Sequence, residues 1–448
     1  MNPVRIIEKK RDGKTLNPKE IQWMIQQYDE GSIPDYQMAA LLMAIYYQGM
    51  NDEEIWTMTC AMAASGDTID LSSVPGIKVD KHSTGGVGDT VTLAALPLAA
   101  AAGVPILKMS GRALGITGGT ADKLESIPGY RTALPEDQMI RQVQQCRLAM
   151  VTQSSRLAPA DGQIYSLRDA TATVESIPLI AASIMSKKIV SGSEALILDV
   201  KCGRGAFMKD VRQAEELARI LRRIGNLAGL PTTVFLTDMT VPLGQAIGNS
   251  VEVDEAVEVL RGRGSCRLRS LCIILAGAMI KAGGVASSQA EGEEKAKNGI
   301  TSGSGLEQFK QCIEAQGGDT QWIDKGQLTP KTRCVTVYAQ KSGYITDIDP
   351  VILAETVIRM GGGRMKKGDP IDHFVGLRLK QDMGTFVHTG DPLLNLYMPQ
   401  GGDWKSIESQ AESAVRMGEN PRSLPLIYKM WESDNNDLEN QDFRTLIK

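Results

Sequence analysis

Apolar residues at helical spacing mark the first 70 residues of the chain. The segment after Asn17-Pro18 starts as helices commonly do, with an N-cap residue and proline in the first turn. Its apolar positions share one helical face: Ile21, Met24, Ile25 and Tyr28. Two segments of the same kind follow, over residues 34–49 and from residue 51 to about 65. The pattern predicts a small α-helical domain over residues 1–70.

Beyond residue 77 the pattern changes to short apolar runs that alternate with helical segments. The runs at residues 104–109, 195–200 and 232–237 are typical of buried strands. Helices are predicted over residues 91–102, 135–146 and 210–228. This alternation predicts an α/β domain with a mostly parallel sheet. We expect it to span residues 71–330, with a return of the chain to the helical domain around residues 160–193.

The last third of the chain has a different composition. Residues 285–305 are rich in Gly, Ser, Ala, Glu and Lys, which predicts a loop or a mobile helix end. From about residue 331, segments with β-hairpin character flank a predicted helix over residues 350–360. The expected fold is therefore α/β: a small N-terminal helical domain, a larger α/β domain, and a C-terminal α+β, barrel-sandwich-like module over residues 331–448.

Charge and cysteine content exclude several classes of protein. The formal net charge of −4 argues against a nucleic-acid surface, which needs a basic excess. No stretch approaches the roughly 18 apolar residues of a membrane span, and the first residues lack the apolar core of a signal peptide. Seven scattered cysteines without a Cys-x-x-Cys pair fit reduced thiols, and three histidines exclude a histidine-rich metal site. We expect a cytoplasmic protein that binds neither membrane nor nucleic acid.

Three turns rich in glycine and hydroxyl groups lie close together, at residues 80–89, 108–112 and 115–125. Glycine lets the main chain approach an anion closely, and N–H groups at helix starts bind its charge. The first turn lies between a strand predicted at residues 77–79 and a helix beginning near Thr90. It is neither a Walker loop nor a Gly-x-Gly-x-x-Gly motif. A single turn of this kind is often only a turn, but three together favour a phosphate site.

A second polar cluster follows on a predicted helix, where Ser183 and Lys187 lie four residues apart and so share one face. Such a pair can activate a nucleophile or hydrogen-bond a flat polar ligand. Lysine is also common in the last turn of a helix, where it interacts with the helix dipole. The spacing alone favours this solvated helix end.

The motifs taken together resemble the pyrimidine and thymidine nucleoside phosphorylase family over nearly the whole chain. They are Lys-His-Ser-Thr-Gly-Gly-Val-Gly-Asp at residues 81–89, Met-Ser-Gly-Arg at 109–112, Thr-Gly-Gly-Thr at 117–120, the Arg-Asp to Lys-Lys segment at 168–188, and Leu-Asp-Val-Lys-x-Gly-x-Gly-Ala-Phe at 198–207. The resemblance implies an enzyme that reversibly transfers a pentose between a pyrimidine base and phosphate. Uridine, thymidine and deoxyuridine would be its substrates in pyrimidine salvage.

The resemblance also implies roles for individual residues. The residues that would hold phosphate are Lys81, Ser83, Thr92, Lys108, Ser110 and Thr120. The residues that would hold the base are His82, Arg168, Ser183 and Lys187, and among them His82, Arg168 and Lys187 would be catalytic. The base gains negative charge as it leaves, so the cationic groups can stabilise it and His82 can donate a proton or a hydrogen bond.

Family members also bind a monovalent cation, usually potassium, and form homodimers through the helical domain. The matching positions for the ion are Gly88, Thr90, Leu243, Ala246 and Glu255. By resemblance the ion is structural, phosphate is the co-substrate, and no organic cofactor is needed. The two domains are expected to open and close around the substrate.

Four positions bear on substrate preference or depart from the family pattern. Lysine at position 108 is similar to the bifunctional bacterial enzymes, which take uridine as well as thymidine, whereas strict thymidine enzymes tend to have an apolar residue there. Ala113 and Ile116 replace a usual glycine and histidine beside the third turn. Arg204 lies in Cys-Gly-Arg-Gly, where the family usually has Thr-Gly-x-Gly, and is expected beside a ligand-facing loop.

The sequence leaves several other functions open. A strict thymidine phosphorylase and an inactive paralogue both fit the same motifs. An anthranilate-type phosphoribosyltransferase has a similar fold and a related glycine loop, although the Lys-His-Ser prefix and the motifs around Arg168 and Lys187 disfavour it. A carrier-type protein is disfavoured because the tail contains no Asp-Lys-Ala or Met-Lys-Met attachment sequence.

Overall fold

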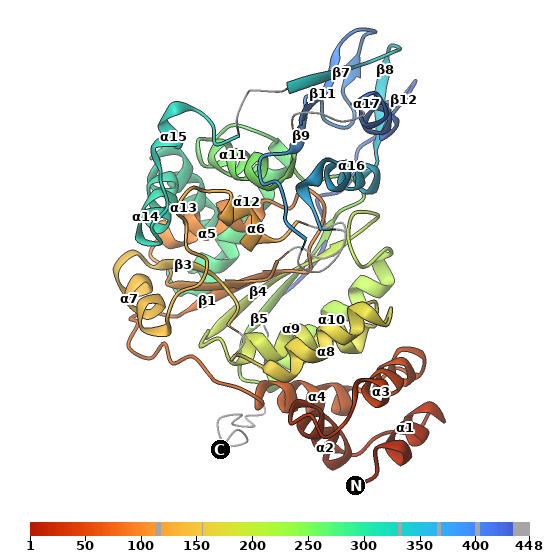
Figure 1. Cartoon of the computed structure of the whole chain (residues 1–448). Helices are drawn as coiled ribbons and strands as arrows, with labels where there is room; N and C mark the ends of the chain where they lie inside the picture. Colours follow the sequence, from red (N-terminus) through yellow and green to blue (C-terminus); the bar gives the residue numbers. More distant parts are fainter. Residues whose placement is uncertain (113–117, 155, 330–333, 365–368, 399–403, 433–448) are drawn as a thin grey trace.

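The N-terminal helices begin where the sequence places their caps. The computed structural model describes residues 1–448 except 113–117, 155, 330–333, 365–368, 399–403 and 433–448. Its first helices are α1 (Pro3–Arg11), α2 (Pro18–Asp29), α3 (Asp35–Gln48) and α4 (Asp52–Ala63). Capping boxes start two of them: Asn17 with Glu20 at α2 and Asn51 with Glu54 at α4. The predicted helical domain is confirmed, and it lies at the foot of the molecule in Figure 1.

A central sheet carries the second domain. Its strands are ordered β1 (Val79–Ser83), β4 (Ala195–Cys202), β5 (Thr232–Asp238) and β13 (Ile427–Trp431). The first three are parallel, and β13 joins antiparallel at the edge. A parallel pair, β2 (Ile106–Ser110) and β3 (Leu148–Thr152), lies beside β1, since the Val79 amide donates to the Pro105 carbonyl oxygen over 3.1 Å. The predicted mostly parallel α/β domain is confirmed.

Helices cover both faces of this sheet (Figure 1). On one side lie α5 (Val91–Ala101), α6 (Thr120–Glu125), α11 (Asn249–Leu260), α12 (Cys266–Ala282), α13 (Gln289–Thr301), α14 (Ser304–Ala315) and α15 (Gln321–Lys325). On the other lie α7 (Glu136–Cys146), α8 (Pro159–Ala170), α9 (Ile177–Ile189) and α10 (Val211–Leu227). Strand β5 shows the division, because Phe235 packs into the first core while Val234 and Leu236 pack into the second. The second core is shared with the N-terminal helices, including Met24 of α2 and Met185 of α9.

Two local predictions are wrong, and one strand is missing from the sequence-based prediction. Strand β1 begins at Val79 and contains Lys81 and His82, so these residues do not lie in a turn after the strand. Strand β3 was not predicted at all. Residues 285–305 form α13 and the start of α14 rather than a loop. Their small residues have a packing reason, because a Cβ at Gly292 would lie 2.3 Å from the Gly277 carbonyl oxygen of α12, so the two helices could not approach as closely.

In its described residues, the C-terminal module contains two small sheets and two α-helices. Its elements are β7 (Cys334–Tyr338), β8 (Gly343–Ile348), α16 (Pro350–Val357), the π-helical turn η1 (Ile358–Gly362), β9 (Gly376–Leu379), β10 (Phe386–Val387), β11 (Pro392–Tyr397), α17 (Trp404–Ser413) and β12 (Val415–Gly418). The predicted strands and helix are present, but β8 pairs with β10 and β12 while β11 pairs with β7 and β9. Strand β6 (Ala246–Gly248) of the central domain pairs with β9, and β13 returns to β5. Among the residues that the structure describes, two strand pairings therefore join the module to the central domain.

Candidate active site

A large cavity lies between the carboxyl end of β1 and the helices α8 and α9. Its volume is about 1530 Å³. The cavity has two walls, the first at the ends of β1 and β2 and the second on α8 and α9. The sequence-predicted residues that line it come from both walls: His82, Ser83, Thr92, Lys108, Ser110, Thr120, Arg168, Ser183 and Lys187. Lys81 is fully buried beneath the first wall and does not line the cavity. The structure thus brings the two polar clusters of the sequence to one cavity, at the strand ends where parallel sheets bind ligands.

The first wall is built by the turn after β1 and by the end of β2. The Lys81 ammonium lies 3.4 Å from Thr92 Oγ1 and 3.6 Å from Asp199 Oδ2. Within the described chain, the buried Ser110 hydroxyl has no hydrogen-bond partner. Buried hydroxyls nearly always have a partner, so an unpaired one facing a cavity indicates a ligand position. Hydroxyls, an ammonium group and helix-start amides are the groups that bind an oxyanion.

Lys108 and Lys188 flank a buried carboxylate at the base of this wall. The Lys108 ammonium donates to the Lys81 carbonyl oxygen over 2.6 Å and lies 3.6 Å from Asp80 Oδ1, while Lys188 Nζ lies 2.6 Å from Asp80 Oδ2. Burial lowers the pKa of Lys108 to about 7, with Lys188 and Lys81 adding to the effect and Asp80 opposing it. Burial and the neighbouring lysines, led by Lys188, also hold the pKa of His82 well below its ordinary value. His82 is therefore neutral near pH 7 and able to donate one hydrogen bond.

The second wall presents two cations on α8 and α9. The Arg168 guanidinium donates to the carbonyl oxygens of Thr173, Leu179 and Val174, over 3.2, 3.1 and 2.6 Å. Burial lowers its pKa to about 10, so it stays charged. The Lys187 ammonium lies 2.5 Å from Asp161 Oδ2 and 3.1 Å from Ser183 Oγ. This network makes Ser183 and Lys187 parts of a half-buried polar cluster rather than a solvated helix end.

Several residues of the cavity were missed from the sequence. Asp161 and Tyr165 line it beside Arg168, and the Tyr165 ring centroid lies 5.7 Å from the Arg168 guanidinium carbon and 5.8 Å from Lys187 Nζ. The three α8 residues are four and three apart, so helical spacing could have grouped them. Arg364, from the C-terminal module, also lines the cavity and donates to Asp122 of α6 over 2.8 and 3.0 Å. No local pattern indicates that contact, because the two residues lie far apart in sequence.

A separate buried cluster gathers the residues expected to hold a cation. Thr90 Oγ1 lies 3.2 Å from Glu252 and 3.3 Å from Glu255, and the Glu255 carboxylate accepts the amides of Gln245 and Ala246. The Gly244 amide donates to the Gly88 carbonyl oxygen over 3.2 Å, and the Leu243 amide to that of Val87 over 3.4 Å. Burial raises the pKa of Glu255 to about 7, with Glu252 adding to the effect. In the described ranges, no three His, Cys, Asp or Glu side chains are arranged as a metal site.

Three family domains match the sequence in the order of the observed fold. A glycosyl transferase family helical bundle domain matches residues 4–66, the a/b domain of that family matches residues 76–306, and a pyrimidine nucleoside phosphorylase C-terminal domain matches residues 344–418. A pyrimidine-nucleoside phosphorylase of Geobacillus stearothermophilus is 46% identical over 430 residues, which are 96% of this chain and 99% of that protein. The chain belongs to the pyrimidine-nucleoside phosphorylase family.

Other relatives agree with this membership. A pyrimidine-nucleoside phosphorylase of Staphylococcus haemolyticus is 48% identical over 398 residues, which are 89% of this chain and 92% of that protein. The crystal structure of anthranilate phosphoribosyltransferase from Thermus thermophilus aligns with a TM-score of 0.57 and 19% identity, covering 69% of this chain and 99% of that one. At that identity the likeness shows a shared fold. In the described part of the chain, no helix is long and apolar enough to cross a membrane.

One departure from the phosphorylase family pattern has a structural explanation. Arg204 itself does not line the cavity, whereas Phe207 of the same loop does. Its guanidinium pairs with Asp347 and Asp349 at the junction of β8 and α16, and it donates to the Thr240 carbonyl oxygen. The arginine therefore links the central domain to the C-terminal module. The other two departures, Ala113 and Ile116, lie outside the described residues.

Proposed function

We propose that this family member catalyses the reversible phosphorolysis of uridine, thymidine and deoxyuridine to free base and (deoxy)ribose 1-phosphate, in cytoplasmic pyrimidine salvage. The observation that carries the proposal is one cavity with an anion-binding wall facing a wall of paired cations. Phosphate and nucleoside would meet there with the sugar between the walls. Two reactants held in such an arrangement react as if in one molecule, which removes much of the entropic cost.

Phosphate would be held by the first wall, the anion-binding wall at the ends of β1 and β2, with Ser110 supplying the unpaired hydroxyl. Its oxygen would attack C1′ of the sugar as the bond from C1′ to the base nitrogen breaks and the electron pair leaves with the base. The base then carries negative charge on its ring oxygens. Arg168 and Lys187 would stabilise that charge, because preorganised donors in a dry site act most strongly on charge that develops during reaction.

Arg168 is suited to this role by its existing contacts. A guanidinium has five N–H donors in a fixed plane. Three backbone carbonyl oxygens of Thr173, Val174 and Leu179 accept from it, which fixes its orientation and leaves two donors for the base. His82, neutral and at the carboxyl end of β1, would donate a hydrogen bond from its one N–H to the departing base.

We also propose that a potassium ion binds the cluster of Gly88, Thr90, Leu243, Ala246 and Glu255. The donor chemistry fits, because carbonyl oxygens, a hydroxyl and one carboxylate are hard oxygen ligands. The charge fits as well. Lys123 lies 2.5 Å from Glu252, whereas no ion pair within 4.0 Å is found for Glu255 in the described structure, and the nearby Arg378 only partly offsets the effect of its burial. Gly88 adopts φ +68°, and a Cβ there would lie 3.2 Å from the Ala246 carbonyl oxygen. The ion would tie the glycine turn to residues 243–255.

A homodimer through the helical domain is supported by an exposed face of α3. Tyr36 and Tyr47 are 74% and 78% exposed, and Met43 is 36% exposed. These positions are seven and four residues apart, so they form one apolar stripe along the helix. Exposed apolar surface of this kind marks interaction sites, and twofold pairing places the same patch on both copies.

Two alternative activities, a strict thymidine phosphorylase and an anthranilate-type phosphoribosyltransferase, predict different substrates. Lys108 favours the broader enzyme over a strict thymidine phosphorylase, since resemblance associates this lysine with uridine use. An anthranilate-type transferase shares the fold, but it would need diphosphate as the departing group and no pyrimidine nucleoside. The two cationic side chains of the second wall, Arg168 and Lys187, would stabilise a departing base and therefore favour phosphorolysis.

The test compares purified protein with uridine, deoxyuridine and thymidine, each with phosphate and potassium, and follows base release by chromatography. We expect release from all three and none when phosphate is omitted. Release from thymidine and deoxyuridine alone would identify the strict deoxyribonucleoside enzyme. No release from any nucleoside would contradict the proposed function and leave the inactive paralogue or, if activity with anthranilate and phosphoribosyl diphosphate appears, the transferase.

A further inference from the structure

A carboxylate lies inside the anion-binding wall. Asp89, in the turn between β1 and α5, lines the cavity with Ser83 and Gly85, and its side chain is 7% exposed. The Ser83 hydroxyl donates to Asp89 Oδ2 over 2.5 Å and accepts the Gly85 amide over 3.1 Å. A negative group among the groups expected to hold phosphate repels that ligand unless the two share a hydrogen.

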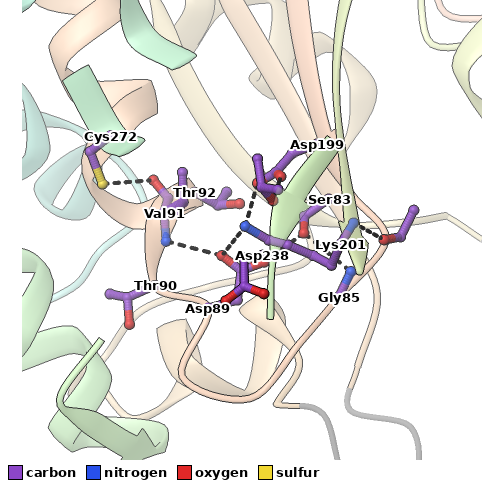
Figure 2. A network of polar contacts seen from close by, with 12 residues as sticks. Ser83, Gly85, Asp89, Thr90, Val91, Thr92, Asp199, Lys201, Asp238 and Cys272 are labelled. Carbon is purple, nitrogen blue, oxygen red and sulfur yellow. Dashed lines mark hydrogen bonds and ion pairs between the residues drawn. The ribbon is translucent and has the colours of Figure 1, made fainter. Parts of the chain in front are cut away.

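Lysines behind the wall keep this carboxylate charged. In Figure 2 the side chain of Lys201, a residue of β4, lies between the carboxylates of Asp89 and Asp199. Its ammonium is fully buried, 2.7 Å from Asp199 Oδ2 and 4.0 Å from Asp89 Oδ1. Lys123 holds the same turn through the Asp89 carbonyl oxygen, over 2.9 Å. A carboxylate flanked in this way accepts hydrogen bonds and donates none.

Asp89 has acceptor capacity left on its cavity side. A carboxylate offers about four lone-pair positions. Within the described chain, the Ser83 hydroxyl takes one, and the Val91 amide makes a long contact of 3.4 Å with Oδ1. The remaining positions suit a ligand that brings its own hydrogen.

Oxyanions differ in whether they bring that hydrogen. Inorganic phosphate and arsenate keep a proton on one oxygen at neutral pH. Sulfate carries none, and monofluorophosphate has the charge and shape of monohydrogen phosphate with fluorine in place of the hydroxyl. A site built to accept a hydroxyl hydrogen rejects an analogue without it, because the acceptor is then left facing a lone pair.

We propose that Asp89 selects the oxyanion by accepting a hydrogen bond from the protonated oxygen of phosphate, which turns an unprotonated oxygen toward the sugar. Asp89 is thus a specificity-determining residue for the co-substrate. The inference rests on the proposed function in one respect, since it takes the anion at this wall to be phosphate. It adds the basis on which phosphate is told apart from other tetrahedral anions.

The first experiment uses the wild-type protein and measures binding of each anion by calorimetry. We expect phosphate and arsenate to bind about 10- to 100-fold more tightly than monofluorophosphate and sulfate, the range for a hydrogen bond to a charged group. Because monofluorophosphate matches the charge of phosphate, equal affinity for the two overturns the proposal. Calorimetry needs no turnover, so binding of phosphate without base release would refute the proposed function and leave this inference standing.

The second experiment compares Asp89→Asn with Asp169→Asn. The asparagine amide can donate to an unprotonated oxygen, so the preference for phosphate over monofluorophosphate should fall about 10-fold or more. Lys201 keeps Asp199 at 2.7 Å in this variant, and thermal unfolding checks that the fold survives. Asp169 is an exposed carboxylate at the cavity margin, so its replacement makes the same charge change away from the phosphate wall and should keep the preference. An unchanged preference in Asp89→Asn overturns the proposal.

Discussion

Replacing Lys187 with alanine tests most directly whether the second wall binds the base, as proposed. The change removes an ammonium group that lies 2.5 Å from Asp161 Oδ2 and 3.1 Å from Ser183 Oγ. If Lys187 stabilises charge on the departing base, kcat/KM for uridine should fall about 10²- to 10³-fold, as when one oxyanion donor is removed. Uracil release followed by absorbance measures this.

The same change should also destabilise the protein. The Asp161 side chain is 1% exposed, and in the described structure its Oδ1 has no hydrogen-bond partner. Removing one partner of a fully buried pair costs about 3–5 kcal/mol. The Lys187 side chain is 25% exposed, and water can partly replace it, so we expect the free energy of unfolding to fall by about 2–3 kcal/mol. Urea denaturation measures this loss.

A double variant separates the two effects. Adding Asp161→Asn to Lys187→Ala removes the uncompensated carboxylate, so most of the lost stability should return. The charge on the departing base would still lack its ammonium partner, so kcat/KM should stay low. Recovery of kcat/KM together with stability would refute the reasoning and show that Lys187 acts only on the fold.

Three further predictions concern the other groups of the site and surface. Burial lowers the pKa of Lys108 to about 7, so its ammonium is present below that pH and is lost as the pH rises through it. The phosphate affinity of the wild type should therefore fall across this range relative to that of Lys108→Met, which calorimetry at several pH values measures. Parallel pH profiles of the two proteins would show that Lys108 does not bind phosphate as an ammonium group. Potassium at 100 times its Kd should raise the free energy of unfolding of the wild type by about 2.7 kcal/mol, compared with choline as the replacement cation. In Glu255→Gln most of this stabilisation should be lost, as thermal unfolding would show. Equal stabilisation of the two proteins by potassium would show that the ion does not bind at the Glu255 cluster. Tyr47→Arg should convert a dimer to a monomer in light scattering, whereas Lys19→Ala, an exposed change on α2, should not.

Local features of this fold could be predicted from the sequence. The N-caps Asn17 and Asn51 act on their own first turns, so the pattern identifies both helix starts. Strand β3 is only five residues long and follows directly on Arg147, whose left-handed conformation ends α7, so no turn residue separates the two. The placement of β13 beside β5 depends on pairing across the chain, which no local pattern reports.

The site was predictable to a similar extent. The motifs around His82, Ser110 and Lys187 indicate polar groups, and the structure places them at one cavity. Their hydrogen-bond partners come from other elements, as Asp161 of α8 does for Lys187 of α9. Charge compensation inside a protein depends on these distant contacts. For this reason the sequence pattern alone favoured a solvated helix end at Ser183 and Lys187.

The return of β13 to the central sheet has a consequence for biosynthesis. Strand β5 ends at Asp238, but its edge partner starts at Ile427, after the whole C-terminal module. At roughly 5–20 residues per second, a ribosome needs about 10–40 seconds to make the intervening chain. During that time the β5 edge is an open strand of the kind that recruits other chains. The nascent protein therefore passes through an interval in which chaperone protection of this edge matters most.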